Sequence, residues 1–160
     1  MTLSFLYPLA LVLHLTGLVL VAGTTLIDYM IFKKFWSRFD TDKSGSAIVL
    51  GVLSRLPVLI GIGILLLILS GVTMMALTRG VFGEQVWFRV KFGLVVLICL
   101  NGPLVGRRLG NKLRRLMAGN GPADADPAQF AKVRANLTWF HFSQLLFFVL
   151  IIVLSVFKFN

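Results

Sequence analysis

Residues 56–78 read LPVLIGIGILLLILSGVTMMALT, a run of 23 residues without a charged side chain. A helix of roughly 20 apolar residues spans the hydrocarbon core of a bilayer. Three further uncharged stretches lie at residues 1–27, 92–106 and 135–157. The sequence therefore predicts an all-α bundle of four transmembrane helices, which we expect over residues 5–32, 52–77, 86–106 and 137–157.

The composition of the whole chain agrees with this class. Of 160 residues, 58% are hydrophobic and 14% are charged, and the mean hydropathy is +0.91. A soluble domain of this length has too little interior to bury so many apolar side chains. The net charge of +10 is concentrated in loops beside the spans, so we expect it to orient the chain in the lipid bilayer and expect no nucleic-acid partner. The single Cys99 excludes an intrachain disulfide and a CxxC redox or zinc motif.

The distribution of cations predicts the orientation in the membrane. Twelve of the sixteen Lys and Arg residues flank the two long loops, and only four lie elsewhere. The twelve are Lys33, Lys34, Arg38, Lys43, Arg55, Arg107, Arg108, Lys112, Arg114, Arg115, Lys132 and Arg134. Because positive loops stay inside, we expect both long loops in the bacterial cytoplasm and both termini in the periplasm. The first apolar run is too long for a signal peptide and lacks a basic n-region, so we expect it to be retained.

The second long loop, residues 107–136, is expected to be a cytoplasmic linker. It contains the segment GNGPADADP at residues 119–127. Gly, Pro and Asp in this density interrupt a helix. The sequence therefore predicts that the third span ends before this segment and that the linker is mobile.

His14 is the most deeply placed ionisable residue of the first span. It lies about ten residues from the outer end, or roughly 15 Å at the rise of an α-helix. A neutral imidazole at that depth needs a partner for its N–H group, and its other nitrogen is a common ligand of haem iron. His14 is therefore a candidate metal ligand, and a packed, hydrogen-bonded histidine is the alternative.

Lys91 and Arg89 are candidates for the same outer half of the membrane. The uncharged run 92–106 rises about 22 Å, less than the roughly 30 Å core, so the third span must begin near Trp87. Positions two apart on a helix point about 200° apart. We expect Lys91 to face inward beside His14, and Arg89 to reach the headgroups or a haem propionate. Snorkelling of both side chains is the alternative.

His141 lies near the inner end of the fourth span, about 10 Å from the surface, and so it is not level with His14. One haem held by both histidines would require the fourth span to tilt or shift by roughly two turns. We expect His141 in an inner polar group that is either an Asp28–Arg55 ion pair with a belt aromatic or a second haem or quinone site with His141 as a metal ligand. The members of the expected inner polar group are Asp28, Arg55, Asn136, Trp139 and His141.

Two smaller motifs lie in the spans. The adjacent Met74 and Met75 can ligate copper(I) or haem iron, or simply fill apolar space. Gly102, Gly106 and Gly110 recur every four residues, which is the spacing that lets membrane helices approach closely. Pro103 within this motif predicts a bend.

The residues around these candidates resemble two related families. His14-Leu15-Thr16-Gly17, followed by Ala22-Gly23, resembles the first span of CopD-like copper-resistance membrane proteins and of HemJ-type membrane protoporphyrinogen oxidases. The stretches Trp87 to Phe92 and Arg134-Ala135-Asn136 are similar to the HemJ-type pattern. The resemblance implies a helical bundle that binds haem b, with His14 and Lys91 essential and a porphyrinogen oxidised. Leu137 and Trp139 stand where that family has glutamate and proline, and a histidine that the family has late in the third span is absent near Leu100 and Asn101. The resemblance therefore supports haem binding better than it supports the enzymatic activity.

We therefore expect a redox-active, haem-b-binding protein of the bacterial cytoplasmic membrane that takes electrons from a quinone or a porphyrinogen. The candidate cofactor contacts are His14, Lys91, Arg89 and His141. The alternative is a copper-handling, assembly or scaffold membrane protein without redox catalysis. Because the chain has two histidines, it cannot hold two bis-histidine haems alone, and a homodimer that shares ligands stays open.

The charge distribution gives a direct test of orientation. Alkaline phosphatase is active only after export, so a fusion placed after Asn160 should be active and a fusion within residues 119–126 should be inactive. The reverse result would overturn the assignment of both termini to the periplasm.

Overall fold

The computed structural model describes residues 2–39, 48–49, 51–118 and 127–157. The elements are α1 (Thr2–Phe39), α3 (Leu56–Leu77), η1 (Val81–Glu84), α4 (Val86–Asn101), η2 (Gly102–Gly106), α5 (Arg107–Ala118) and α6 (Pro127–Phe157). Four helical stretches are long and apolar enough to cross a membrane: Phe5–Phe39, Gly51–Leu77, Val86–Met117 and Pro127–Phe157. The predicted all-α, four-helix membrane architecture is confirmed.

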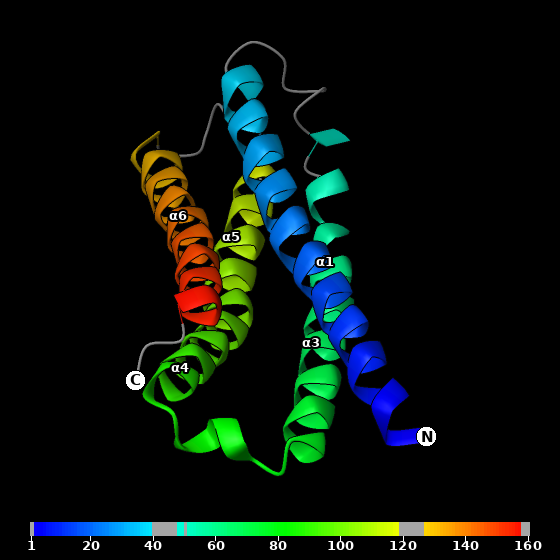
Figure 1. Ribbon diagram of the computed structural model, residues 1–160. Helices are drawn as coiled ribbons and strands as arrows, with labels where there is room; N and C mark the ends of the chain where they lie inside the picture. Colours follow the sequence, from blue (N-terminus) through cyan, green and yellow to red (C-terminus); the bar gives the residue numbers. More distant parts are fainter. Residues whose placement is uncertain (1, 40–47, 50, 119–126, 158–160) are drawn as a thin grey trace.

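The helices form an elongated bundle of two pairs (Figure 1). Helix α1 packs along α3, and α4 packs against α6, while α1 also contacts α6. The end of α1, the starts of α3 and α6 and the end of α5 lie together at one end (Figure 1). We call this the basic end, because the described cations of both long loops lie there. The start of α1, the end of α3, η1 and the start of α4 lie at the opposite end (Figure 1).

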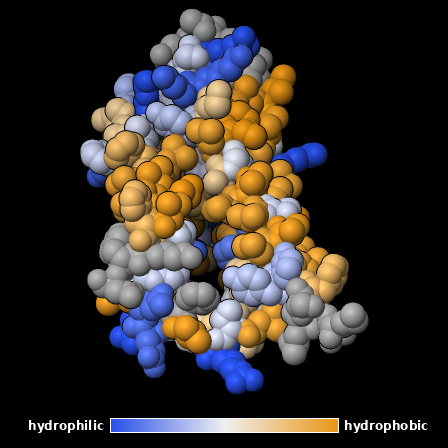
Figure 2. Space-filling model, in the orientation of Figure 1, coloured by the Kyte–Doolittle hydropathy of each residue, from blue (hydrophilic) through white to orange (hydrophobic). Residues whose placement is uncertain are grey.

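The surface between the two ends is apolar. Figure 2 shows hydrophobic residues over the flanks of the bundle and hydrophilic residues gathered at the basic end. Large aliphatic and aromatic side chains such as Val19, Val72 and Phe92 are mostly exposed. Such a surface requires lipid around it, so the bilayer is the environment of these helices. Lys43 and Lys158 lie outside the described residues.

The helices extend well beyond the predicted spans, and both ends of the predicted linker, residues 107–136, are helical. Residues 107–118 form α5, and α6 begins at Pro127. Helix α5 is amphipathic, with Leu109, Leu113 and Leu116 packed against apolar residues of α1 and α6. This packing stabilises a helix outside the uncharged run. The helix does end at Ala118, directly before GNGPADADP, whose residues 119–126 lie outside the described part of the chain.

The contact between α1 and α3 depends on two glycines. A Cβ atom built at Gly17 would lie 3.0 Å from the carbonyl oxygen of Gly63, and one built at Gly63 would lie 2.5 Å from Cγ2 of Val21. The two backbones therefore touch directly. Close approach of this kind strengthens van der Waals packing, which is a main source of helix association in lipid.

Two apolar clusters connect the remaining helices. The cluster in the middle of the bundle joins α1 to α4 and α6 through Val21, Ile98, Phe148 and Ile151. The cluster at the basic end is aromatic and joins α1 to α5 and α6. Its buried members are Phe32, Phe35, Trp36, Leu113, Phe130, Val133 and Leu137. Helix α1 belongs to both clusters and to the glycine contact, so it is the common partner of the fold.

The glycine motif of the third span is only partly a packing motif. Gly106 lies under the ring of Phe140, whose Cζ would be 2.6 Å from an added Cβ, whereas Gly102 and Gly110 have open space. The expected role of the latter two glycines is therefore wrong. Pro103 lies in a π-helical turn, Gly102–Gly106, because the proline lacks the N–H group that an α-helical bond requires.

We expect Gly63→Ala to destabilise the protein by about 1–3 kcal/mol, because the added methyl overpacks the α1–α3 contact. Gly61→Ala is the matched control, since Gly61 lies on the same helix and has open space around it. Thermal unfolding in detergent, followed by circular dichroism, should show a lower midpoint for the Gly63 variant alone. Equal midpoints for both variants would contradict the backbone contact.

Candidate functional site

One face of α1 carries two polar groups on either side of an apolar residue. His14, Val21 and Asp28 are each seven residues apart, which is nearly two helical turns, so they share a face. Val21 belongs to the apolar cluster in the middle of the bundle. His14 and Asp28 therefore lie about 10 Å from that cluster in opposite directions, and about 21 Å from each other along the helix.

The His14 site consists of His14, Ser70 and Lys91. Nδ1 of His14 lies 3.0 Å from Oγ of Ser70 on α3. The ring fits against the backbone of Gly71, where an added Cβ would be 3.5 Å from Cε1 of the ring. The Ser70 hydroxyl thus bonds the imidazole, and the absence of a side chain at Gly71 leaves room for the ring against α3.

The hydrogen bonds around Ser70 favour one tautomer of His14. Oγ of Ser70 lies 2.5 Å from the carbonyl oxygen of Leu66, to which it can donate its single hydrogen. With that bond made, the hydroxyl oxygen accepts from Nδ1 of His14. In this tautomer Nε2 keeps a lone pair.

Lys91 and Arg89 take the directions expected from their spacing. Lys91 is half-buried, and its charge is close enough to act on the His14 ring. Arg89 is exposed, and its Nε donates to the carbonyl of Gly83 at 3.1 Å. The charge of Lys91 therefore reaches the His14 ring, and Arg89 is directed to the connection before α4. Figure 2 shows a hollow between the two helix pairs, with hydrophilic residues at its rim.

The second polar group is the His141 pair, formed by His141 and Asp28. Nε2 of His141 lies 3.0 Å from Oδ2 of Asp28, and Nδ1 lies 2.7 Å from the carbonyl oxygen of Leu137. The ring of Phe32 stacks on the imidazole at a centroid distance of 4.9 Å and an angle of 27°. The pair links α1 to α6 next to the aromatic cluster.

This geometry changes the expected role of the inner polar group. Asp28 pairs with His141 rather than with Arg55, which is exposed and forms no ion pair with Asp28 in the described part of the chain. Both ring nitrogens of His141 face protein oxygen atoms, so neither offers a free lone pair to a metal. Asn136 and Trp139 are exposed. The expected five-residue group is therefore reduced to His141 and Asp28.

The two methionines differ in their surroundings. Met75 packs on the connection after α3, where its Cε would be 3.1 Å from a Cβ at Gly83. Met74 lies one helical turn after Ser70 and so shares the face of α3 that holds His14. Among the described residues, no cluster of three His, Cys, Asp or Glu side chains is placed to hold a metal ion.

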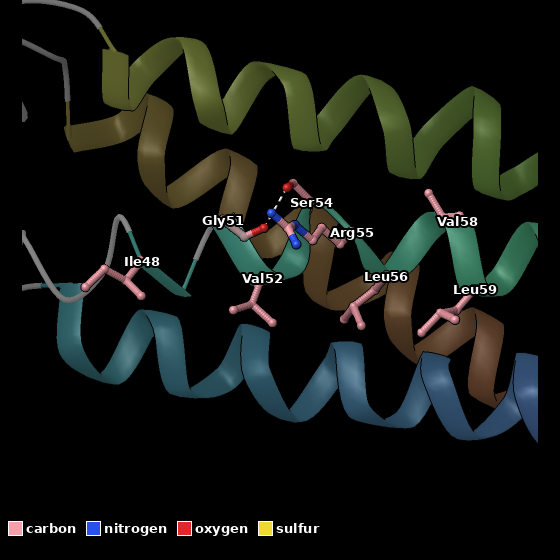
Figure 3. Close-up of a pocket in the computed structure, with 8 residues that line it drawn as sticks. All are labelled: Ile48, Gly51, Val52, Ser54, Arg55, Leu56, Val58 and Leu59. Atoms are coloured by element: carbon pink, nitrogen blue, oxygen red, sulfur yellow. Dashed lines mark hydrogen bonds between the residues drawn. The ribbon is translucent and has the colours of Figure 1, made fainter.

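A groove of about 760 Å³ lies at the start of α3, and its lining includes no residue of either polar group (Figure 3). Its walls are mainly aliphatic, and Arg55 is the charged residue among them. The lining residues are Ile48, Gly51, Val52, Ser54, Arg55, Leu56, Val58 and Leu59. None of them can act as a redox or metal ligand, so the candidate chemistry lies at His14 instead.

Sequence analysis missed two residues of these sites. Ser70 is the hydrogen-bond partner of His14, and Gln144 is buried one turn after His141. Ser70 interrupts a long apolar run, and Gln144 follows Ser143 directly before another apolar run. That signal is available in the sequence, because polar side chains in a span are directed toward protein rather than lipid.

Comparison with known proteins gave no match to a family model, to a curated protein or to a solved structure.

We expect His141→Ala to destabilise the protein by roughly 3 kcal/mol, because it leaves the Asp28 carboxylate without its buried partner. Trp139→Ala is the matched control, since Trp139 is two residues away and 70% exposed. Denaturant unfolding in mild detergent micelles should separate the two variants. A His141 variant as stable as the Trp139 variant would show that the pair does not hold α1 to α6.

Proposed function

We propose that the protein binds haem b, with Nε2 of His14 as an axial ligand of the iron. The observation that carries this proposal is the 3.0 Å contact between Nδ1 of His14 and Oγ of Ser70. With Nδ1 as the donor, the opposite nitrogen has a lone pair for the iron. A metal-ligating histidine characteristically donates its other N–H to a fixed acceptor, which sets the tautomer and orients the ring.

The surroundings of His14 also suit a haem. The porphyrin supplies four of the iron ligands, so one or two protein ligands are sufficient. Lys91 is close enough for its charge to act on the ring, and a cation beside the ligand can neutralise a propionate. Bound haem iron would supply one-electron chemistry. The residues of the chain would set ligation, dielectric and access.

The cellular context is part of the same proposal. The basic end faces the cytoplasm of a bacterium, because positive loops stay inside, and the His14 site then lies in the periplasmic half of the membrane. The electrons come from a quinone or a porphyrinogen, as the HemJ-type resemblance implies, and two copies of the chain can associate. The hollow between the helix pairs (Figure 2) is a suitable entry for such a reductant.

A copper-handling protein is the second candidate, and one observation favours it. Met74 shares the α3 face that holds His14, so a thioether and an imidazole are available on adjacent helices. Copper(I) prefers soft ligands of this kind. Absorption spectroscopy and metal analysis of the purified protein distinguish the two, because only haem gives a Soret band.

We expect His14→Ala to abolish the Soret absorbance of protein that has been purified and reconstituted with haem b. Ser70→Ala should bind haem about 10–100-fold more weakly, the usual effect of removing the partner of a ligating histidine. Lys91→Ala should retain the band with reduced haem content. A shifted band in that variant would instead make Lys91 the opposite ligand.

Two variants serve as controls for this experiment. Thr16→Ala removes a hydroxyl two residues from His14 that donates to the carbonyl of Val12, and it should keep the full Soret band. His141→Ala should also keep it, because the His141 pair is a separate site. A His14→Ala protein that is folded by circular dichroism and has an unchanged spectrum would overturn the proposal.

A further inference from the structure

We propose that His141 and Asp28 form an intramembrane proton-binding site that takes up and releases one proton at the basic end of the bundle. This inference does not depend on haem binding. It follows from the contacts of one buried imidazole and the acceptors on its two nitrogens.

The count of protons follows from the partners of the ring. The carbonyl of Leu137 can only accept, so Nδ1 of His141 carries a hydrogen. The contact between Nε2 and Oδ2 of Asp28, at 3.0 Å, then requires a second hydrogen on either atom. The pair is an imidazolium with a carboxylate, or an imidazole with a carboxylic acid. In both forms it holds one proton more than a neutral histidine beside an ionised aspartate.

The surroundings isolate this proton from other titratable groups. The ring is packed by Phe32, Phe140 and Tyr29, of which only Tyr29 can titrate, with its ring centroid 5.9 Å away. Helix α5 adds apolar residues, such as Leu113, to the neighbouring cluster. On α6 the preceding cation is Arg134, which lies two turns earlier over the ring of Trp36. The extra proton is therefore a property of His141 and Asp28.

The two partners differ in their access to the surroundings. The side chain of His141 is 4% exposed and that of Asp28 is 22% exposed, so a proton reaches the ring through Asp28. One turn further along α6, on the same buried face, Oε1 of Gln144 is buried without a hydrogen-bond partner among the described residues. An unused acceptor thus lies on the inward side of the pair.

The experiment uses nitrogen-15 NMR of the full chain in bilayers with labelled histidine. The chain has two histidines, so the spectrum contains two rings. We expect one of two results. Either the ring of His141 carries hydrogen on both nitrogens, or it carries one hydrogen and Asp28 gives the infrared band of a carboxylic acid. Asp28→Asn should leave the ring of His141 with one proton and remove that band. Ser70→Ala should change only the other ring.

Reversibility completes the test. On raising the pH, the wild-type pair should lose one proton. The Asp28→Asn protein should therefore release one proton fewer than the wild-type protein in the same titration. Two results would overturn the proposal. One is a singly protonated His141 beside an ionised Asp28 throughout the pH range in which the protein is folded. The other is a second proton that never leaves within that range.

Discussion

The fold depends on α1, because lipid provides no hydrophobic driving force between helices and direct contacts must replace it. Helix α1 makes such contacts in both directions. On the α3 side, the backbone of Gly17 contacts the backbone of Gly63. On the α6 side, Asp28 shares a hydrogen bond with His141. Each contact satisfies a requirement that the apolar surface alone cannot meet: close approach in the first case and a partner for a buried polar group in the second.

The sequence was sufficient to predict the four helices and the position of His14. Long uncharged runs have few alternatives in lipid, since every backbone polar group must be bonded within the helix. The depth argument also separated His14 from His141 correctly, because both lie on helices whose rise per residue is fixed. The short third run also predicted that Lys91 lies inside the membrane, in the same outer half as His14.

Side-chain partners were harder to predict than depth. Asp28 was expected to bind Arg55, an oppositely charged residue at the same end, but in the structure it faces α6 and binds His141. Depth alone does not say which helices are neighbours. The spacing along α1 does contain that information: the half-buried His14 and Asp28 alternate with the buried Val21 and Phe35 every seven residues. This stripe mixes polar and apolar residues, so a search for a purely apolar face overlooks it.

The separation of the two polar groups on α1 also has an electrical consequence. His14 and Asp28 lie about 21 Å apart along the helix, some two-thirds of a hydrocarbon core of roughly 30 Å. A charge that moved from one to the other would cross that share of the transmembrane voltage. At 100 mV the free energy of the move would change by about 1.6 kcal/mol. Any transfer of charge between these sites would therefore be driven or opposed by the membrane potential itself.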